Sequence, residues 1–165
     1  EQFGLTAERV HEELGDYVRR FAVPSEGQAA AGCLILALDT GRILIPHRSA
    51  HCQQPNTWGT WGGAIDRGES PEAAVLRELS EETGFEAPVD TIPLFVFRHK
   101  SGFRYHNFLI TTAREFVPRI NWETQAFAWF DFGDWPQPAH FGLTAFLDDP
   151  RSNAVIEKLS RANPA

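Results

Sequence analysis

The sequence predicts a mixed α/β domain in which helices lie on both sides of a mixed β-sheet. Two observations support this prediction: apolar, β-leaning runs occur before and after a central amphipathic helix, and helical periodicity returns at both ends of the chain. The chain has 165 residues, of which 42% are hydrophobic and 22% are charged. Because this length and composition are typical of one globular core, we expect residues 1–165 to form a single domain.

The first predicted element is an amphipathic helix over residues 5–21. Its apolar residues recur at helical spacing, at Leu5, Val10, Leu14, Val18 and Phe21. We expect this helix to pack on the body of the domain, and an arm that forms a dimer is the alternative.

Two β-leaning runs follow, over residues 29–38 and 42–47. The Asp-Thr-Gly segment between them, residues 39–41, is a turn signal, so a β-hairpin is predicted. A short aromatic strand predicted over 57–61 leads directly into Gly62.

The central helix is predicted over residues 71–83. Ser70 is a good N-cap, Pro71 suits the first helical position, and Gly84 can end the helix because glycine readily adopts the left-handed conformation. One stripe of the helix should face the core: Val75, Leu76, Leu79 and Thr83.

Three strands and two helices are predicted after the central helix. The strands cover residues 92–98, 103–112 and 126–132, and the helices cover residues 142–148 and 152–162.

Charge and cysteine content exclude several classes of function. The formal net charge is −7, so binding to duplex DNA or to an anionic membrane surface is not expected. No apolar run is long enough to span a membrane, and no signal-peptide pattern occurs. The two cysteines, Cys33 and Cys52, form no metal-binding pattern and fit a reducing cytoplasm, with Cys33 in the core and Cys52 in a loop. The chain has no methionine, so the native start is expected to lie outside it or to have been removed.

The central helix also carries an unusual acidic face. Glu78, Glu81 and Glu82 lie together, because residues three and four apart are neighbours on a helix, and Glu69 adds a carboxylate just before the helix. Like charges at this spacing destabilise a helix slightly. A hard divalent cation such as Mg²⁺ would offset that repulsion, whereas a solvated helix face is the alternative.

The stretch from Gly63 to Phe85 resembles the Nudix box, G-x5-E-x7-R-E-U-x-E-E-x-G-U, where U is a bulky apolar residue. The fixed positions are filled by Gly63, Glu69, Arg77, Glu78, Leu79, Glu81, Glu82 and Gly84. Phe85 stands where an aliphatic residue is usual, and looser similarity extends over about residues 30–132. The resemblance implies an α/β/α sandwich and hydrolysis of a nucleoside diphosphate linked to another group X, with Mg²⁺ or Mn²⁺ as the cofactor.

The resemblance also implies roles for single residues. Glu78 and Glu82 would be the main metal ligands, and Glu81 would bind a further ion or act as the general base. The Gly62 carbonyl is a candidate backbone ligand. Arg77 would hold the acids in place, with Glu69 as its nearest partner.

One further acid is expected from outside the box. Glu123, followed by Trp129 and Phe130, resembles the segment that supplies an additional metal ligand or base in related RNA pyrophosphohydrolases. A surface glutamate is the alternative interpretation.

Arginines and aromatic residues are the candidates for substrate binding. Arg48 and Arg104 are expected to contact phosphate oxygens, although exposed charges of this kind are often only surface residues. Trp61 and Tyr105 are expected to stack on a base, and burial in the core is the alternative. Trp61 also replaces the proline that is usual before the two glycines.

Markers of several subfamilies are not met. His99 stands where members acting on ADP-ribose tend to have proline, and Ser101 where members acting on diadenosine polyphosphates tend to have tyrosine. The motif of coenzyme A pyrophosphatases is also absent, which leaves nucleotide sugars, oxidised nucleotides and capped RNA ends open.

Two other functions compete with hydrolysis. A non-catalytic nucleotide-binding module usually lacks some box glutamates, whereas all of them are present here. An isomerase of the same fold would use a cysteine and a glutamate, and the sequence around Cys52 does not match that motif. The expected partner is a small nucleotide, and a homodimer is expected from the family resemblance alone.

Overall fold

The computed structural model describes residues 29–100 and 102–162. The helix predicted over residues 5–21 lies outside this part of the chain. The described helices and strands occur in the order β1 (Ala29–Ala37), β2 (Ile43–Arg48), β3 (Trp61–Ala64), α2 (Pro71–Thr83), β4 (Asp90–Arg98), β5 (Arg104–Thr112), β6 (Thr124–Phe130), α3 (Phe141–Asp148) and α4 (Pro150–Arg161).

The strands form one mixed six-stranded sheet. Its order is β4-β5-β1-β2-β6, and β3 pairs with β1. Strands β1 and β5 are parallel, and all other pairs are antiparallel. Strand β1 is therefore central, and its apolar residues are almost fully buried.

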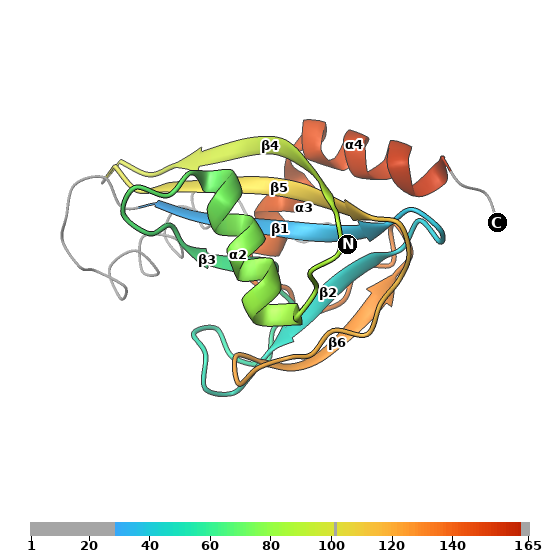
Figure 1. Ribbon diagram of the computed structural model, residues 1–165, viewed down its shortest axis with the longest axis horizontal. Coiled ribbons are helices and arrows are strands. Elements are labelled where there is room, and N and C mark those ends of the chain that lie inside the picture. Colours follow the sequence, from blue (N-terminus) through green and yellow to red (C-terminus); the bar gives the residue numbers. More distant parts are fainter. Residues whose placement is uncertain (1–28, 101, 163–165) are drawn as a thin grey trace.

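Helices cover both faces of this sheet, as Figure 1 shows. Cys33 and Ile35 of β1 pack in the same core cluster as Val75 and Leu79 of α2. The alternating residues of β1 belong to a second cluster with α3 and α4, which contains Leu34, Leu36, Leu143, Phe146 and Ile156. The predicted α/β/α sandwich around a mixed sheet is therefore confirmed.

Most predicted elements are present with small shifts at their ends. The hairpin of β1 and β2 is confirmed, as are β4 and β5. Strand β6 begins and ends two residues before the predicted range of 126–132, and α3 and α4 start slightly early. Cys33 is fully buried, as expected of a core cysteine.

The prediction of a strand over residues 57–61 is wrong, because the strand in this region is β3, Trp61–Ala64. Only Trp61 of that range belongs to β3, which continues through Gly62 and Gly63, while Trp58 forms isolated bridges to His47 and Ala139. Glycine has a low strand propensity, so the sequence pattern favoured the aromatic residues before it. Pairing with β1 decides the position of the strand instead.

No helix among residues 29–100 and 102–162 is long and apolar enough to cross a membrane.

Candidate active site

Helix α2 is held in place by its ends and by its apolar stripe. The Ser70 side chain accepts a hydrogen bond from the Ala73 N–H at 3.1 Å, and Pro71 occupies the first turn. Gly84 ends the helix with a positive φ of 68°. Because Val75 and Leu79 are buried against the sheet, the glutamates are displayed in fixed positions.

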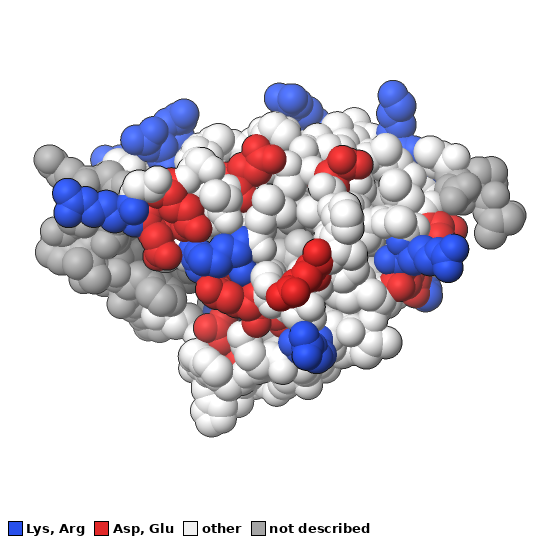
Figure 2. Space-filling view, viewed as in Figure 1, with Lys and Arg blue, Asp and Glu red and all other residues white. Residues whose placement is uncertain are grey.

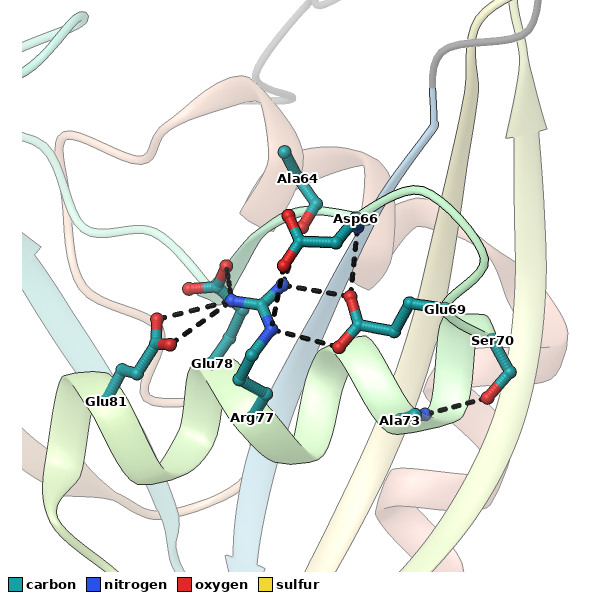
Figure 3. Close-up of polar contacts among 8 residues, drawn as sticks. All are labelled: Ala64, Asp66, Glu69, Ser70, Ala73, Arg77, Glu78 and Glu81. Carbon is teal, nitrogen blue, oxygen red and sulfur yellow. Dashed lines mark hydrogen bonds and ion pairs between the residues drawn. The ribbon is translucent and has the colours of Figure 1, made fainter.

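Arg77 is the centre of the acidic face, as Figure 3 shows. Its Nε and Nη2 donate to the two carboxylate oxygens of Glu69 at 2.9 and 3.1 Å, which is a bidentate pair. Its Nη1 donates to Glu78 at 2.9 Å and lies 3.3 Å from Glu81. Nη2 also donates to the carbonyl of Ala64 at 2.9 Å. Arg77 therefore contacts Glu69, Glu78 and Glu81, and its role in holding these acids in place stays a prediction.

This network shifts the pKa values of both partners in the bidentate pair. The hydrogen bond from Arg77 lowers the pKa of Glu69, and the Asp66 N–H adds a second bond to the same carboxylate at 2.9 Å. The bond to Glu69 likewise raises the pKa of Arg77, so the guanidinium stays charged. In Figure 2, acidic side chains gather around basic atoms over the face that α2 covers.

Glu82 is the most deeply placed of the box acids, with 7% of its surface exposed. Its Oε2 accepts a hydrogen bond from the Gly62 N–H at 3.0 Å. Burial raises the pKa of Glu82, and the nearby charges of Glu78 and Glu123 add to this rise. The sequence assigned a role to the Gly62 carbonyl, whereas the contact to the acid in this structure uses the Gly62 N–H.

Glu78 packs directly against the glycine pair. A Cβ on Gly63 would lie 2.5 Å from Glu78 Oε1, so only glycine leaves room for this carboxylate. Burial raises the pKa of Glu78, and Arg77 partly opposes that rise. Glu81 is more exposed, with 56% of its side-chain surface accessible.

Glu123 reaches the same region from the loop before β6. Its backbone carbonyl accepts a hydrogen bond from the Ser49 N–H at 2.9 Å, which ties this loop to the end of β2. The Glu123 charge raises the pKa of both Glu78 and Glu82, so these carboxylates share one electrostatic environment. Cys52 contacts the Glu123 carbonyl and does not line the pocket described below.

The carboxylates of Glu78 and Glu82 are oxygen ligands of the kind that a hard divalent cation prefers. Glu78 and Glu82 are partly or largely buried carboxylates that repel one another, and a cation would offset the cost of keeping both ionised. Their side chains are turned towards Arg77 and the Gly62 N–H, and the described residues contain no group of three acidic, histidine or cysteine side chains already arranged around a common point.

A pocket opens beside the two glycines, between the sheet and α3. Its empty space is about 570 Å³, a volume that includes open solvent at the mouth of the pocket. Its lining combines aromatic and polar residues: Arg48, Thr60, Gly62, Gly63, Phe95, Phe97, Tyr105, Asn107, His140, Phe141, Gly142 and Ala145.

Of the four residues predicted to bind substrate, two line the pocket and two do not. Arg48 and Tyr105 line the pocket, as a substrate contact requires. Trp61 is 1% exposed, and its indole N–H donates to the Leu44 carbonyl at 3.1 Å. This buried ring has no face to offer a base, which corrects the stacking role expected for it. Arg104 lies at the exposed start of β5 and is not part of the pocket lining.

Several pocket residues were missed at the level of sequence, among them His140 and Asn107. His140 caps α3, where its Nδ1 accepts a hydrogen bond from the Gly142 N–H at 3.0 Å, and burial lowers its pKa to about 3. Asn107 is 4% exposed within β5. A polar residue inside the apolar run of β5 was the signal that could have identified Asn107, whereas His140 carried no recognisable pattern.

The central helix of this α/β/α sandwich presents a glutamate–arginine network beside a strand of glycines, and comparison with known proteins names the family that this arrangement belongs to. The sequence model of the NUDIX domain matches residues 27–149, so this chain belongs to the Nudix family. The 8-oxo-dGTP diphosphatase of Escherichia coli strain K12 is 33% identical over 138 residues, which cover 81% of this chain and 96% of that protein.

Other similarities are shorter or purely structural. Sequences from two Mycobacterium tuberculosis strains are 44% identical over 61 residues, and this match spans 28% of the length of those relatives. The crystal structure of the Nudix hydrolase RenU from M. smegmatis superposes with a TM-score of 0.60 at 22% identity. The match covers 85% of this chain and 89% of RenU. The latter similarity supports the fold.

Proposed function

We propose that this protein hydrolyses the pyrophosphate bond of a nucleoside diphosphate derivative with the help of Mg²⁺ or Mn²⁺. One observation carries the proposal: Gly62 and Gly63 contact the acids of α2 and also line the pocket. A nucleotide seated in that pocket would place its phosphates beside the carboxylates.

Glu78 and Glu82 would hold the cation, and Glu123 lies close enough to influence both electrostatically. When bound, such a cation neutralises phosphate oxygens and lowers the pKa of water. Arg77 fixes the positions of Glu69 and Glu78 from one guanidinium group. Glu81 remains accessible to solvent and would either accept the proton of the attacking water or bind a further ion.

Arg48 would contact the phosphates of the substrate. Arg48 lines the pocket, and its positive charge acts to lower the pKa of Glu82. Arg48 is therefore near both the pocket and the acids. Its Nε donates to the Gln53 carbonyl at 2.9 Å, which fixes the orientation of the guanidinium. Tyr105 packs closely against Gly32, where an added Cβ would collide with the phenol hydroxyl, and Tyr105 would pack on the base.

A nucleoside triphosphate is the first substrate to test, with phosphate as the group X. The E. coli relative that aligns over most of this chain is an 8-oxo-dGTP diphosphatase, which supports this choice. In the proposed reaction, a water oxygen bonds to phosphorus as the bridging P–O bond breaks, giving a nucleoside monophosphate and pyrophosphate.

The test is a panel of canonical, oxidised and X-linked nucleotides with Mg²⁺, followed by product analysis. Wild-type protein should release a monophosphate from at least one compound. Glu82→Gln keeps an oxygen that can accept from Gly62 but removes the charge, and we expect turnover to fall at least about tenfold. Glu157→Gln, which removes an exposed carboxylate from α4, is the matched control and should leave turnover unchanged. Equal turnover in wild type and Glu82→Gln would refute the proposed site.

A further inference from the structure

Asn107 lies opposite an irregularity in the neighbouring strand. The register of β4 against β5 shifts between Pro93, which pairs with Phe108, and Val96, which pairs with His106. Two residues of β4 therefore face the single residue Asn107, as in a β-bulge. The bulge leaves the carbonyl of Phe95 outside the regular ladder and turned towards the Asn107 side chain.

The contacts of Asn107 fix which way its amide group points. Its Nδ2 lies 3.3 Å from the carbonyl of Phe95 and 3.3 Å from the carbonyl of Tyr105. Carbonyl oxygens only accept hydrogen bonds, so the NH₂ group must face them and both of its donors are used. The remaining polar atom, Oδ1, is an acceptor only, and no donor among the described residues bonds to it.

This acceptor belongs to the pocket rather than to the outer surface. Asn107 is 4% exposed, lines the pocket, and is flanked there by Phe95 and Tyr105. A ligand that fills the pocket would cover this acceptor and remove it from water, so the ligand should supply a donor at this point. Aromatic walls beside a fixed acceptor are suited to a planar base that carries an N–H group.

We propose that Asn107 selects the bound base by accepting a hydrogen bond at Oδ1 from an N–H group of that base. The inference rests on the proposed function, in that the ligand of the pocket is a nucleotide. It assigns the bulge of β4 a role in specificity, because the Phe95 carbonyl holds the amide in the orientation that exposes Oδ1.

The test uses pairs of nucleoside 5′-monophosphates that differ by one N–H donor. GMP and IMP differ by the 2-amino group, and AMP and purine riboside monophosphate by the 6-amino group. 8-oxo-GMP differs from GMP by the N–H at position 7 together with the carbonyl at position 8. Calorimetric Kd values should differ at least about tenfold within one or more pairs, in favour of the donor-bearing ligand. A flat set of pairs in the wild type overturns the proposal, and so does a complete lack of nucleotide binding.

Two variants separate recognition from a purely structural role. Asn107→Leu keeps the approximate volume and removes the acceptor, so the preference within the pair should fall towards one through weaker binding of the donor-bearing ligand. Thr112→Val removes a buried hydroxyl from the other end of β5, which donates to the Arg114 carbonyl, and should leave the preference unchanged. A preference that survives in Asn107→Leu contradicts the proposal.

A measurement on the wild type covers the case in which Asn107→Leu fails to fold. The side-chain amide resonances of Asn107 should shift with the donor-bearing ligand and not with its matched partner, and equal shifts overturn the proposal. Hydrolysis is followed separately on the nucleotide panel. Cleavage without donor preference refutes the role of Asn107 alone, whereas donor preference without cleavage refutes the proposed hydrolysis alone.

Discussion

Gly63→Ala should disable the acid site while leaving the fold intact. The added Cβ would lie 2.5 Å from Oε1 and 2.7 Å from Cδ of Glu78, well inside normal contact. These atoms are the far end of a flexible side chain, so the carboxylate can move away and the backbone can stay. The Oε1 atom that must move is also the one that accepts from Arg77 at 2.9 Å. A carboxylate displaced by about 1 Å should lower kcat/KM by about 10²-fold, the cost typical of such a misplacement.

The assay compares kcat/KM and the melting temperature of Gly63→Ala with those of Gly68→Ala. Gly68 has a positive φ of 82° and no atom near its potential Cβ, so alanine there should cost about 1 kcal/mol in backbone strain, or roughly 2–4 °C, without touching an acid. We expect the opposite pattern for Gly63→Ala, which should lose activity with a melting temperature close to wild type. Wild-type kcat/KM in folded Gly63→Ala would refute the position given to Glu78.

Three further predictions concern Arg77, the cation and His140. Arg77→Lys should lower kcat/KM at least about tenfold, because a single ammonium cannot replace the bidentate bond to Glu69 and the bond to Glu78 together. Mg²⁺ at ten times its Kd should stabilise the wild type by about 1.4 kcal/mol, roughly 3–6 °C, and Glu82→Gln should lose most of this shift. The lowered pKa of His140 means that the unfolded chain binds a proton more readily, so stability should fall as pH drops below about 6.5, by about 2 kcal/mol at pH 5. His140→Asn, which can still cap α3, should show a flatter pH dependence in denaturant titrations, and identical profiles would contradict the burial of a neutral imidazole.

The acid site was predictable because its order in space follows its order in the chain. Glu78, Glu81 and Glu82 share a face through helical periodicity alone, and Ser70 and Gly84 mark the ends of that helix. The contact of Arg77 with Glu69 joins residues that are only eight positions apart in the chain. Local rules therefore sufficed, and the layers of the fold followed from alternation within strands such as β1.

The pocket was less predictable because it depends on contacts between distant segments. Trp61 reads as an exposed aromatic next to a glycine loop, yet pairing of β3 with β1 carries it into the core. The orientation of Asn107 depends on a bulge in β4, and no local sequence pattern predicts that bulge. His140 enters the pocket from the start of α3, far along the chain. Register and bulges are set by tertiary packing, so sequence periodicity cannot supply them.

The glycine pair would allow acids on one side of the sheet to act on a ligand held on the other, as the proposed function requires. Glu78 lies over Gly63 on the face that α2 covers, whereas the pocket lies between the sheet and α3. Residues 62 and 63 carry no side chains, so β3 separates the two compartments by backbone alone. The Gly62 N–H that holds Glu82 belongs to the same backbone, and its φ of 142° and tight approach to Ala31 leave no room for a Cβ. A side chain at either position would add atoms between the acids and the pocket. This is a physical reason for glycine at both positions, beyond their place in the family pattern.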